Sequence, residues 1–556
     1  MTNSNTNNVF ALKQLDLAVK RHEEGDFFGA LNVLHSVLKQ NPTYEAYRET
    51  AKVYMDLDLT RIALGYWFRF LDACPANCRA EAYNALGACF YLLDNFRLAG
   101  YYYDLQLSIA PDAEFDYLDE KIDYFETITD SEEPEFYVCY PPKKMPSDKR
   151  IELAEKNLYL TEDKEAIKLL QSIRKNDINY VGAQLRIAAY YAIGGNVNKA
   201  KNIINGLIED FPGDTLPPIN MFVLLADTGD FKGAEKAYDD LKEYDLKTFE
   251  ECFKVATSCM NVNRDDWAME YVKKALDDYP YAVGGLFLAG AASYNLGNKK
   301  DAERYFTSAY QITDYSVIKY YIDRCREDKP TLKRIGYEMR YPDKIVKKLI
   351  ERTVSLVNEP PKKITAKNRE KILEIIDFVY SFPNNLHESV ALALMDLPDG
   401  EIRNALIDLL MINEIEEKVK YAIVYKLLMN NVERQISAVY SGLYFNFKLI
   451  PVWSMDAQGP ASVVKKAHAY AFSRMSAFYK TDFEKLTKVA KETLTALTEN
   501  GNLEKVEDVH ALGASLMILS DSIYSKDLNF LVNYFSTKKT KVNQTLKLIR
   551  CKNEDR

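Results

Sequence analysis

Apolar residues in the first half of the chain recur at the spacing of amphipathic helices, in paired segments separated by short turns. In the stretch from Ala80 to Pro111, small residues stand at Gly87 and Ala99, with large aromatic residues on either side. Small side chains let two antiparallel helices approach closely, and the proline ends the second helix because it cannot continue one. The stretch therefore predicts a helical hairpin that needs neighbours, because one hairpin cannot bury its apolar face alone.

The same spacing recurs in two stretches before this one. With the first residue of each stretch counted as position 1, Ala30 and Ala63 occupy position 20, and Pro42 and Pro75 occupy position 32. This pattern resembles the tetratricopeptide repeat, a helix-turn-helix unit of about 34 residues. The resemblance implies three such repeats over residues 9–113, stacked as an α-solenoid that binds other proteins.

A second array of weaker copies follows after a break in the pattern. Small residues stand at position 8 or 20 of these copies, in Ala166, Ala188, Ala200, Ala234, Ala256, Ala268, Gly290 and Ala302. They predict about five further repeats over residues 147–328. The apolar spacing of Val317 to Arg326 predicts a helix that caps this array.

Polar regions lie on both sides of the first array. Residues 1–8 are rich in Asn and Thr and are expected to form a disordered tail. Residues 114–146 carry many carboxylates and several prolines, which predicts an acidic cap helix followed by a semi-rigid linker. The acidic stretch has two interpretations, a solvated helix or a docking site for a basic partner.

Beyond the second array the pattern changes in kind. The sequences LPDGEIRNALIDLL and EIEEKVKYAIVYKLL resemble consecutive HEAT-type helices, and the β-branched and aromatic content of Gln435 to Val452 predicts a β-hairpin. We divide this part into HEAT-like helices with the hairpin (329–450), C-terminal helices (451–540) and a basic tail expected to fray (541–556). The predicted fold class is all-α: an α-solenoid of two tetratricopeptide arrays plus a mostly helical C-terminal domain with one β-hairpin.

The composition narrows the class of protein without naming a partner. Hydrophobic residues make up 47% and charged residues 28% of the 556 residues, and the net charge of -9 argues against general nucleic-acid binding. No stretch has the roughly 20 consecutive apolar residues of a membrane span. The polar start also lacks the apolar core of a secretory leader. We expect a cytoplasmic protein with reduced cysteines and no membrane contact.

Motifs for catalysis or cofactor binding are absent from the sequence. No pair of histidines has the helical spacing of a zinc protease, no glycine-rich phosphate loop follows a strand, and no Gly-x-Ser-x-Gly elbow occurs. Cys74 and Cys78 stand close together, but zinc needs four converging ligands and the neighbouring sequence offers no fourth. We therefore expect no enzyme, no cofactor and no metal. An enzyme hidden in the C-terminal domain, around the loop Trp453 to Pro460 and His468, is a further alternative.

The candidate binding surface is the concave side of the second array. The resemblance implies that the first helix of each repeat lines this side, and the corresponding positions are mainly apolar. An exposed apolar surface of this extent marks a binding site. The candidate partner-binding residues are Leu185, Leu216, Ile219, Val223, Phe253, Met260, Phe287 and Tyr294. The alternative is that a tightly wound superhelix, or the C-terminal domain of this chain, fills the groove.

The first array presents a more polar face at the same positions, which include Glu45, Arg48, Lys52 and Glu81. Tetratricopeptide proteins that grip the C-terminal carboxylate of chaperones use Lys, Asn and Arg at set positions. The corresponding residues here are Leu15, Val19, Glu49, Glu81 and Ala85. The clamp is therefore absent, and a chaperone co-factor role is not expected.

These observations predict a non-enzymatic scaffold or adaptor that binds a peptide or helix of another protein in the groove of the second array. The alternative is a DNA-binding regulator with a repeat sensor domain and a winged-helix-like unit near residues 399–450. Acidic residues offset Lys418, Lys420, Lys426 and Arg434 in that unit, so no basic face stands out. The identity of the partner and the oligomeric state lie outside what the sequence indicates.

Overall fold

The computed structural model describes residues 2–130, 145–159, 163–327, 332–381, 386–452, 459–478, 481–520 and 527–551. The chain forms two compact units. Unit 1 contains residues 1–19, 34–125 and 342–556, and unit 2 contains residues 20–33 and 126–341. Most of the first array and the C-terminal region therefore share unit 1, and the second array forms most of unit 2.

The first array consists of antiparallel helical pairs at the predicted places. Its helices are α1 (Thr2–Glu23), α2 (Phe27–Gln40), α3 (Tyr44–Asp56), α4 (Thr60–Ala73), α5 (Arg79–Leu92) and α6 (Phe96–Ile109). The prediction of a disordered tail over residues 1–8 is wrong for residues 2–8, which belong to α1. Extending an existing helix costs far less than nucleating one, so a polar stretch can continue the helix that follows it.

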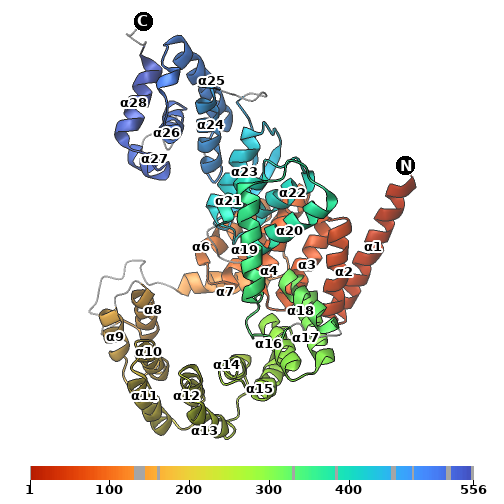
Figure 1. Cartoon of the computed structure of the whole chain (residues 1–556), viewed down its shortest axis with the longest axis vertical. Helices are drawn as coiled ribbons and strands as arrows, with labels where there is room; N and C mark the ends of the chain where they lie inside the picture. Colours follow the sequence, from red (N-terminus) through yellow and green to blue (C-terminus); the bar gives the residue numbers. More distant parts are fainter. Residues whose placement is uncertain are drawn as a thin grey trace. The chain divides into compact units, whose positions relative to one another are not determined.

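The second array begins after α7 (Leu118–Asp130), the predicted acidic cap helix. The predicted linker falls largely on residues 131–144, which lie outside the described residues. Five helical pairs and the predicted cap helix follow in chain order (Figure 1). They are α8 (Ser147–Tyr159), α9 (Asp163–Gln171), α10 (Tyr180–Ile193), α11 (Val197–Asp210), α12 (Leu216–Asp227), α13 (Phe231–Leu241), α14 (Phe249–Ser258), α15 (Asp265–Asp278), α16 (Val283–Asn295), α17 (Lys299–Thr313) and α18 (Ser316–Arg326).

Small residues hold the two helices of each pair together, as the repeat pattern predicts. Ala63, Ala99, Ala234 and Ala302 are all 0% exposed. In α5, a methyl group at Gly87 would lie 2.5 Å from the ring of Tyr103 on α6. In α16, a methyl group at Gly290 would lie 2.7 Å from the ring of Phe306 on α17. The glycine at position 8 thus makes room for the aromatic ring at position 24, which confirms the predicted helical pairing.

The turns inside seven of the pairs share one backbone conformation. Position 15 has a φ between 56° and 85° in Gly25, Asp58, Asp94, Gly195, Gly229, Asn263 and Gly297. These residue types tolerate the left-handed region better than any others. The next residue caps the second helix through its side chain in Asn95, Asn196, Asp230 and Asn298. The sequence therefore encodes each turn as well as each helix.

The C-terminal region is helical apart from one hairpin, which confirms the predicted fold class. Strands β1 (Gln435–Tyr440) and β2 (Leu443–Lys448) pair antiparallel with Tyr440 opposite Leu443. The helices are α19 (Asp343–Asn358), α20 (Ala366–Ser381), α21 (His387–Leu394), α22 (Gly400–Asp408), α23 (Glu417–Met429), α24 (Ser462–Met475), α25 (Phe483–Glu499), α26 (Val509–Leu519), α27 (Leu528–Tyr534) and α28 (Lys539–Arg550). Short 3-10 turns lie at η1 (Ala76–Cys78), η3 (Leu409–Met411) and η4 (Leu503–Lys505).

The end of the chain differs from its prediction. Residues 541–550, expected to fray, belong to α28. Val542, Thr545 and Ile549 are buried on one side of this helix. Their spacing of three and four residues is that of an amphipathic helix, and the many lysines around them obscured it.

The β-hairpin packs on the first array within unit 1. The Tyr102 hydroxyl on α6 donates to the carbonyl of Gly442 at 2.8 Å and accepts from the backbone N–H of Tyr444 at 3.2 Å. Asp72 on α4 accepts hydrogen bonds from the hydroxyls of Tyr444, at 2.9 Å, and Ser437. The hairpin therefore covers the second helices of the first array, which makes this array part of a larger folded unit.

Among the described residues, no helix combines the length and the apolar character that crossing a membrane requires.

Candidate functional site

The inner side of the second array is the surface that the sequence singled out. Figure 1 shows α10, α12 and α14 on the inner side of the curve that these pairs follow, with α11, α13 and α15 on the outer side. Seven of the eight predicted partner-binding residues lie on such first helices, and Met260 lies in the turn that follows α14. They fall into three groups according to what covers them.

Two of the eight belong to the packed interior. Ile219 and Phe287 are both 0% exposed. The ring of Phe287 lies 5.3 Å from that of Phe306 and 5.4 Å from that of Tyr321 on the cap helix. Helices α12 and α16 are apolar because neighbouring helices pack on several of their sides. These two residues are therefore removed from the candidate site.

Two others are covered by the segment that follows the cap helix, residues 332–341, which we name the return segment. The hydroxyl of Tyr294 donates to the carbonyl of Leu332 at 3.2 Å, and Tyr294 is only 6% exposed. The sulfur of Met260 accepts the backbone N–H of Tyr337 at 3.3 Å. At this end of the array the chain itself occupies the inner side.

The remaining four residues keep part of their surface accessible. Leu216 is 43% exposed, and Leu185, Val223 and Phe253 are partly buried. Leu216 lies at the edge of a cleft of about 380 Å³ formed by α8, α10 and the start of α12. At the same cleft Ile178 is 95% exposed. Ile178 and Leu216 are thus two exposed apolar side chains at one cleft.

Carboxylates dominate the charge of this cleft, which we name the acidic cleft. Four carboxylates and one cation line it, namely Asp148, Glu152, Glu155, Asp214 and Arg186. Arg186 Nε lies 2.6 Å from Glu155 Oε1, so that pair is neutral. The Asp214 carboxylate accepts the backbone N–H of Leu216 at 2.9 Å and so fixes the start of α12. The net negative charge beside exposed aliphatic side chains suits a partner that is both basic and apolar.

The inner side of the first array is engaged by the chain itself. Lys52 forms an ion pair with Asp116 at 2.7 Å, and the amide of Asn84 donates to the Asp116 carbonyl at 2.7 Å. Arg48 lies 2.8 Å from Glu49 and 3.8 Å from Glu81. Asp116, part of the acidic stretch that the sequence offered as a docking site, thus binds within unit 1.

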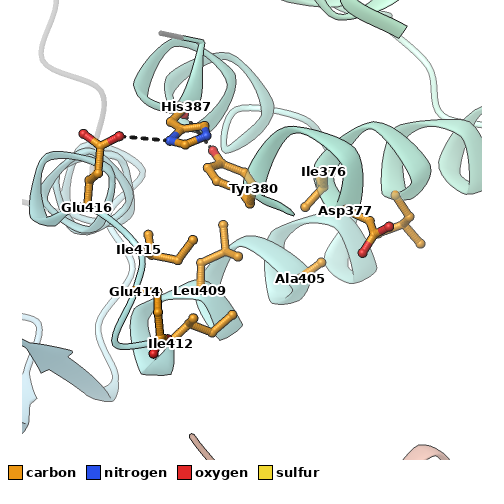
Figure 2. Close-up of a pocket in the computed structure, with 11 residues that line it drawn as sticks. Ile376, Asp377, Tyr380, His387, Ala405, Leu409, Ile412, Glu414, Ile415 and Glu416 are labelled. Carbon is orange, nitrogen blue, oxygen red and sulfur yellow. Dashed lines mark hydrogen bonds and ion pairs between the residues drawn. The ribbon is translucent and has the colours of Figure 1, made fainter. Parts of the chain in front are cut away.

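A pocket in the C-terminal region was not predicted from the sequence. It has a volume of about 520 Å³ and lies between α20, α21, α22 and the loop before α23 (Figure 2). Its apolar walls are formed by Leu373, Ile376, Ala405, Leu409, Ile412 and Ile415, with Tyr380 and the acidic residues Asp377, Glu414 and Glu416 among the other lining residues. The branched aliphatic residues were expected as helix core, so the sequence carried no separate signal for a cavity.

His387 and Glu416 form a polar pair at the edge of this pocket (Figure 2). His387 Nδ1 lies 3.1 Å from the Glu416 carboxylate, and its Nε2 lies 2.8 Å from the Val379 carbonyl. The pKa of Glu416 is lowered, first by its hydrogen bond with Lys418 and then by that with His387. The contact between His387 and Glu416 therefore ties α21 to the start of α23.

The cations that a DNA-binding surface would need are largely engaged within unit 1. Lys420 is 0% exposed, donates to the Val439 carbonyl on the hairpin, and has its pKa lowered to about 8 by burial. Lys426 pairs with Asp396, and Lys418 pairs with Glu416 at 2.6 Å. No observation among these favours the DNA-binding alternative.

The residues considered for catalysis or metal binding have structural surroundings. Cys74 and Cys78 are free thiols, and burial raises the pKa of Cys74 to about 11. Within the part of the chain that the structure describes, no three metal-binding side chains form a cluster. His468 is 1% exposed and lies 3.0 Å from the hydroxyl of Thr487. Of the loop beside it, residues 453–458 lie outside the described residues.

Comparisons with known proteins add little to the geometry. No protein-family model matches the chain, and no curated protein matches it. The chain is similar to the solved structure of MamA AMB-1, with 16% identity over 30% of this chain and 92% of that one, at a TM-score of 0.23. It is similar to yeast Tom70, with 11% identity over 98% of this chain and 95% of that one, at a TM-score of 0.21. At such TM-scores neither likeness carries an argument, so the assignment depends on the helical pairs themselves.

Proposed function

We propose that this chain is a non-enzymatic scaffold of tetratricopeptide-type helical pairs that binds a basic, partly apolar peptide or helix of another protein. The observation that carries the proposal is the acidic cleft, where aliphatic side chains remain exposed and four carboxylates but one cation line the walls. Val223 and Phe253 continue the accessible apolar positions along the inner side of the following pairs.

The chemistry of the cleft indicates what each part of the partner contributes. Burying Ile178 and Leu216 against aliphatic side chains would supply most of the affinity, at about 25 cal/mol for each Å² of apolar surface. Lysine or arginine side chains of the partner would pair with Asp148 and Glu152, which supports selection against acidic partners. Since Lys149 already lies 3.2 Å from Glu152, at an exposed position, the partner cation competes with a weak pair.

The test uses the full-length protein and randomised peptides displayed on phage. Selected peptides should be enriched in Lys or Arg together with Leu, Ile or Phe, and their affinity should be measured by fluorescence anisotropy of labelled synthetic copies. Leu216→Asp should weaken binding by at least about tenfold, because it places a charge on the apolar part of the cleft. Glu152→Lys should also weaken binding, and the loss of affinity should be larger at low salt than at high salt.

A matched control comes from the same array. Ile193 at the end of α10 is 89% exposed and is not part of the acidic cleft. Ile193→Asp should leave the affinity unchanged, and far-UV circular dichroism should show that both variants are folded. Peptides without a basic preference, or an affinity that Leu216→Asp leaves intact, would rule out the cleft as the binding site.

A further inference from the structure

The return segment lies on the last two helical pairs of the second array as an extended ligand lies in a binding site. Within residues 332–341 the main chain makes one described internal hydrogen bond, from the Arg340 N–H to the Glu338 carbonyl at 2.8 Å. Ile335 and Tyr337 are 1% and 8% exposed, whereas Glu338 is exposed. Ile335 and Tyr337 therefore face the array, and the chain bends at residues 337–340.

The side chain of Asn295 forms hydrogen bonds with the main chain of this segment. Its amide group donates to the Ile335 carbonyl at 2.9 Å and accepts the Ile335 N–H at 2.8 Å. A neighbouring β-strand would donate to and accept from the main chain in the same way. Here one side chain makes both hydrogen bonds. This contact does not depend on the side chain of the bound residue, so it would accept any extended peptide with a free N–H at that point.

Asp265 supplies the charge-dependent part of the recognition. Its Oδ1 accepts hydrogen bonds from Arg334 Nη2 at 3.1 Å and from the Tyr337 hydroxyl at 2.6 Å. The same oxygen accepts the Asn295 amide at 2.8 Å, which orients the group that reads the main chain. The Asp265 side chain is 11% exposed, so these bonds are sheltered from water.

Met260 and the glycine of the segment set the remaining specificity. A methyl group at Gly336 would lie 3.3 Å from the terminal methyl of Met260, so a larger residue there would force the sulfur side chain to move. The next N–H of the segment, that of Tyr337, donates to the Met260 sulfur. Arg334, Ile335, Gly336 and Tyr337 therefore each make a contact with the array that a bound peptide of the same sequence could repeat.

We propose that the inner side of α14 to α16 is a peptide-binding site for extended segments of the type Arg-aliphatic-Gly-Tyr, and that the return segment is its resident ligand. Because the resident ligand is tethered to the array, its effective concentration is on the order of millimolar, and an external peptide binds well only when the resident contacts are weakened. This site is separate from the acidic cleft and does not depend on the function proposed for it.

The experiment uses the full chain and a fluorescein-labelled synthetic peptide with the sequence of residues 332–341. The variant Arg334→Ala with Ile335→Ser weakens the resident segment and leaves the array unchanged. The labelled peptide should bind this variant at least about tenfold more tightly than it binds the wild-type chain. Adding Asn295→Ala or Asp265→Asn to the same variant should remove that gain.

Matched controls separate recognition from general loosening. A peptide with Val in place of the glycine, or Glu in place of the arginine, should bind the weakened variant at least about tenfold less well. Tyr294→Phe, which removes one bond to Leu332, should change the affinity by less than about threefold. A folded weakened variant that does not bind the peptide, or that binds it equally well after Asn295→Ala, would overturn the proposal.

Hydrogen exchange of the wild-type chain gives a second readout if the variant fails to fold. The Ile335 amide should exchange at least about tenfold faster than the amide of Ala289 in α16, because the segment can leave while the array stays folded. Equal protection of the two amides would show that the segment is a permanent part of the fold, and would also overturn the proposal.

Discussion

The two arrays are built from the same kind of helical pair, but they differ in what covers their surfaces. In the first array, the hairpin packs on the second helices and Asp116 binds the first helices, through Lys52 and Asn84. In the second array, the return segment covers the inner side of the last pairs, and the acidic cleft leaves earlier pairs open. One repeat pattern thus forms a structural platform in one case and the surface that we propose for partner binding in the other.

The two arrays also share one structural feature, a hydrogen bond from an asparagine side chain to a returning segment of the chain. After its last pair, each chain segment returns to the inner side and places a main-chain carbonyl on an asparagine, Asn84 in the first array and Asn295 in the second. In the first array the contact is one hydrogen bond next to an ion pair. In the second it includes both polar groups of one residue, a buried aliphatic side chain and a buried carboxylate. The second contact therefore involves more groups of the chain than the first.

The largest expected effect on stability comes from comparing a buried residue of the first array with a partly exposed residue of the second. Trp67 in the first array is 0% exposed, and Trp67→Ala should cost about 3–5 kcal/mol of folding free energy through lost burial and the cavity left behind. Leu216→Ala in the second array should cost less than about 0.5 kcal/mol, because Leu216 is partly exposed. Urea denaturation followed by circular dichroism measures both. Similar costs would mean that Leu216 is a core residue and not a binding residue.

The hairpin contact of the first array can be tested with two neighbouring tyrosines. Tyr102→Phe should destabilise unit 1 by about 1–3 kcal/mol, because the Gly442 carbonyl and the Tyr444 N–H lose their shared partner. The hydroxyl of Tyr103 is buried and has no hydrogen-bond partner among the described residues. Tyr103→Phe should therefore be neutral or stabilising. Thermal melts of the two variants should be compared. A smaller loss of stability for Tyr102→Phe than for Tyr103→Phe would contradict the hairpin contact.

Protonation of His468 should weaken unit 1 as the pH falls from about 7 to 5. Burial lowers the pKa of His468 to about 3, with a smaller contribution from Lys491. The unfolded chain binds this proton near pH 6.5, so stability present above about pH 6.5 is lost as the pH falls toward 3. The loss should reach about 2 kcal/mol at pH 5.

The ring of His468 lies next to the Thr487 hydroxyl, which donates to the Phe483 carbonyl at 2.8 Å and so accepts from Nε2–H. His468→Gln should flatten the pH dependence of urea unfolding between about pH 5 and 7. The second array, residues 147–328, contains no histidine. A variant that keeps the full slope would assign the effect to other groups.

The smallest expected effect on stability comes from the acidic cleft. Asp148→Asn with Glu152→Gln should change the folding free energy by less than about 0.5 kcal/mol, since both side chains lie at an open surface. The same double variant should lower the affinity for basic peptides selected on the wild-type chain and reduce its dependence on salt. Isothermal titration at low and high salt distinguishes the two readouts. An unchanged affinity would confine the partner to the apolar part of the cleft.

The helical pairs could be predicted from the sequence because each one is encoded locally. Gly87 and Gly290 mark where an aromatic ring of the partner helix must fit, and the Gly, Asn or Asp at position 15 marks the left-handed turn. The hairpin was predicted for the same reason, since strand-forming residues flank Ser441 and Gly442. Helix α28 was missed because lysines mask its apolar stripe.

The binding surface could be predicted only in part. An apolar residue on a first helix looks the same in the sequence whether a partner, a neighbouring helix or the chain itself covers it. Ile219 and Phe287 are covered by helices, Met260 by the return segment, and Leu216 remains open. A signal for the return segment did exist, because Ile335, Tyr337, Met339 and Tyr341 alternate with other residues as in an extended strand.

The sequence by itself therefore determined the repeat, its turns and the fold class, because these depend on residues within about 34 positions of one another. The tertiary structure decided which surfaces stay exposed, because that depends on segments far apart in the sequence, such as Tyr102 with Gly442 and Asp265 with Arg334. Local pattern specifies how a helix pairs with the next one. Long-range contacts specify what is left for a partner to bind.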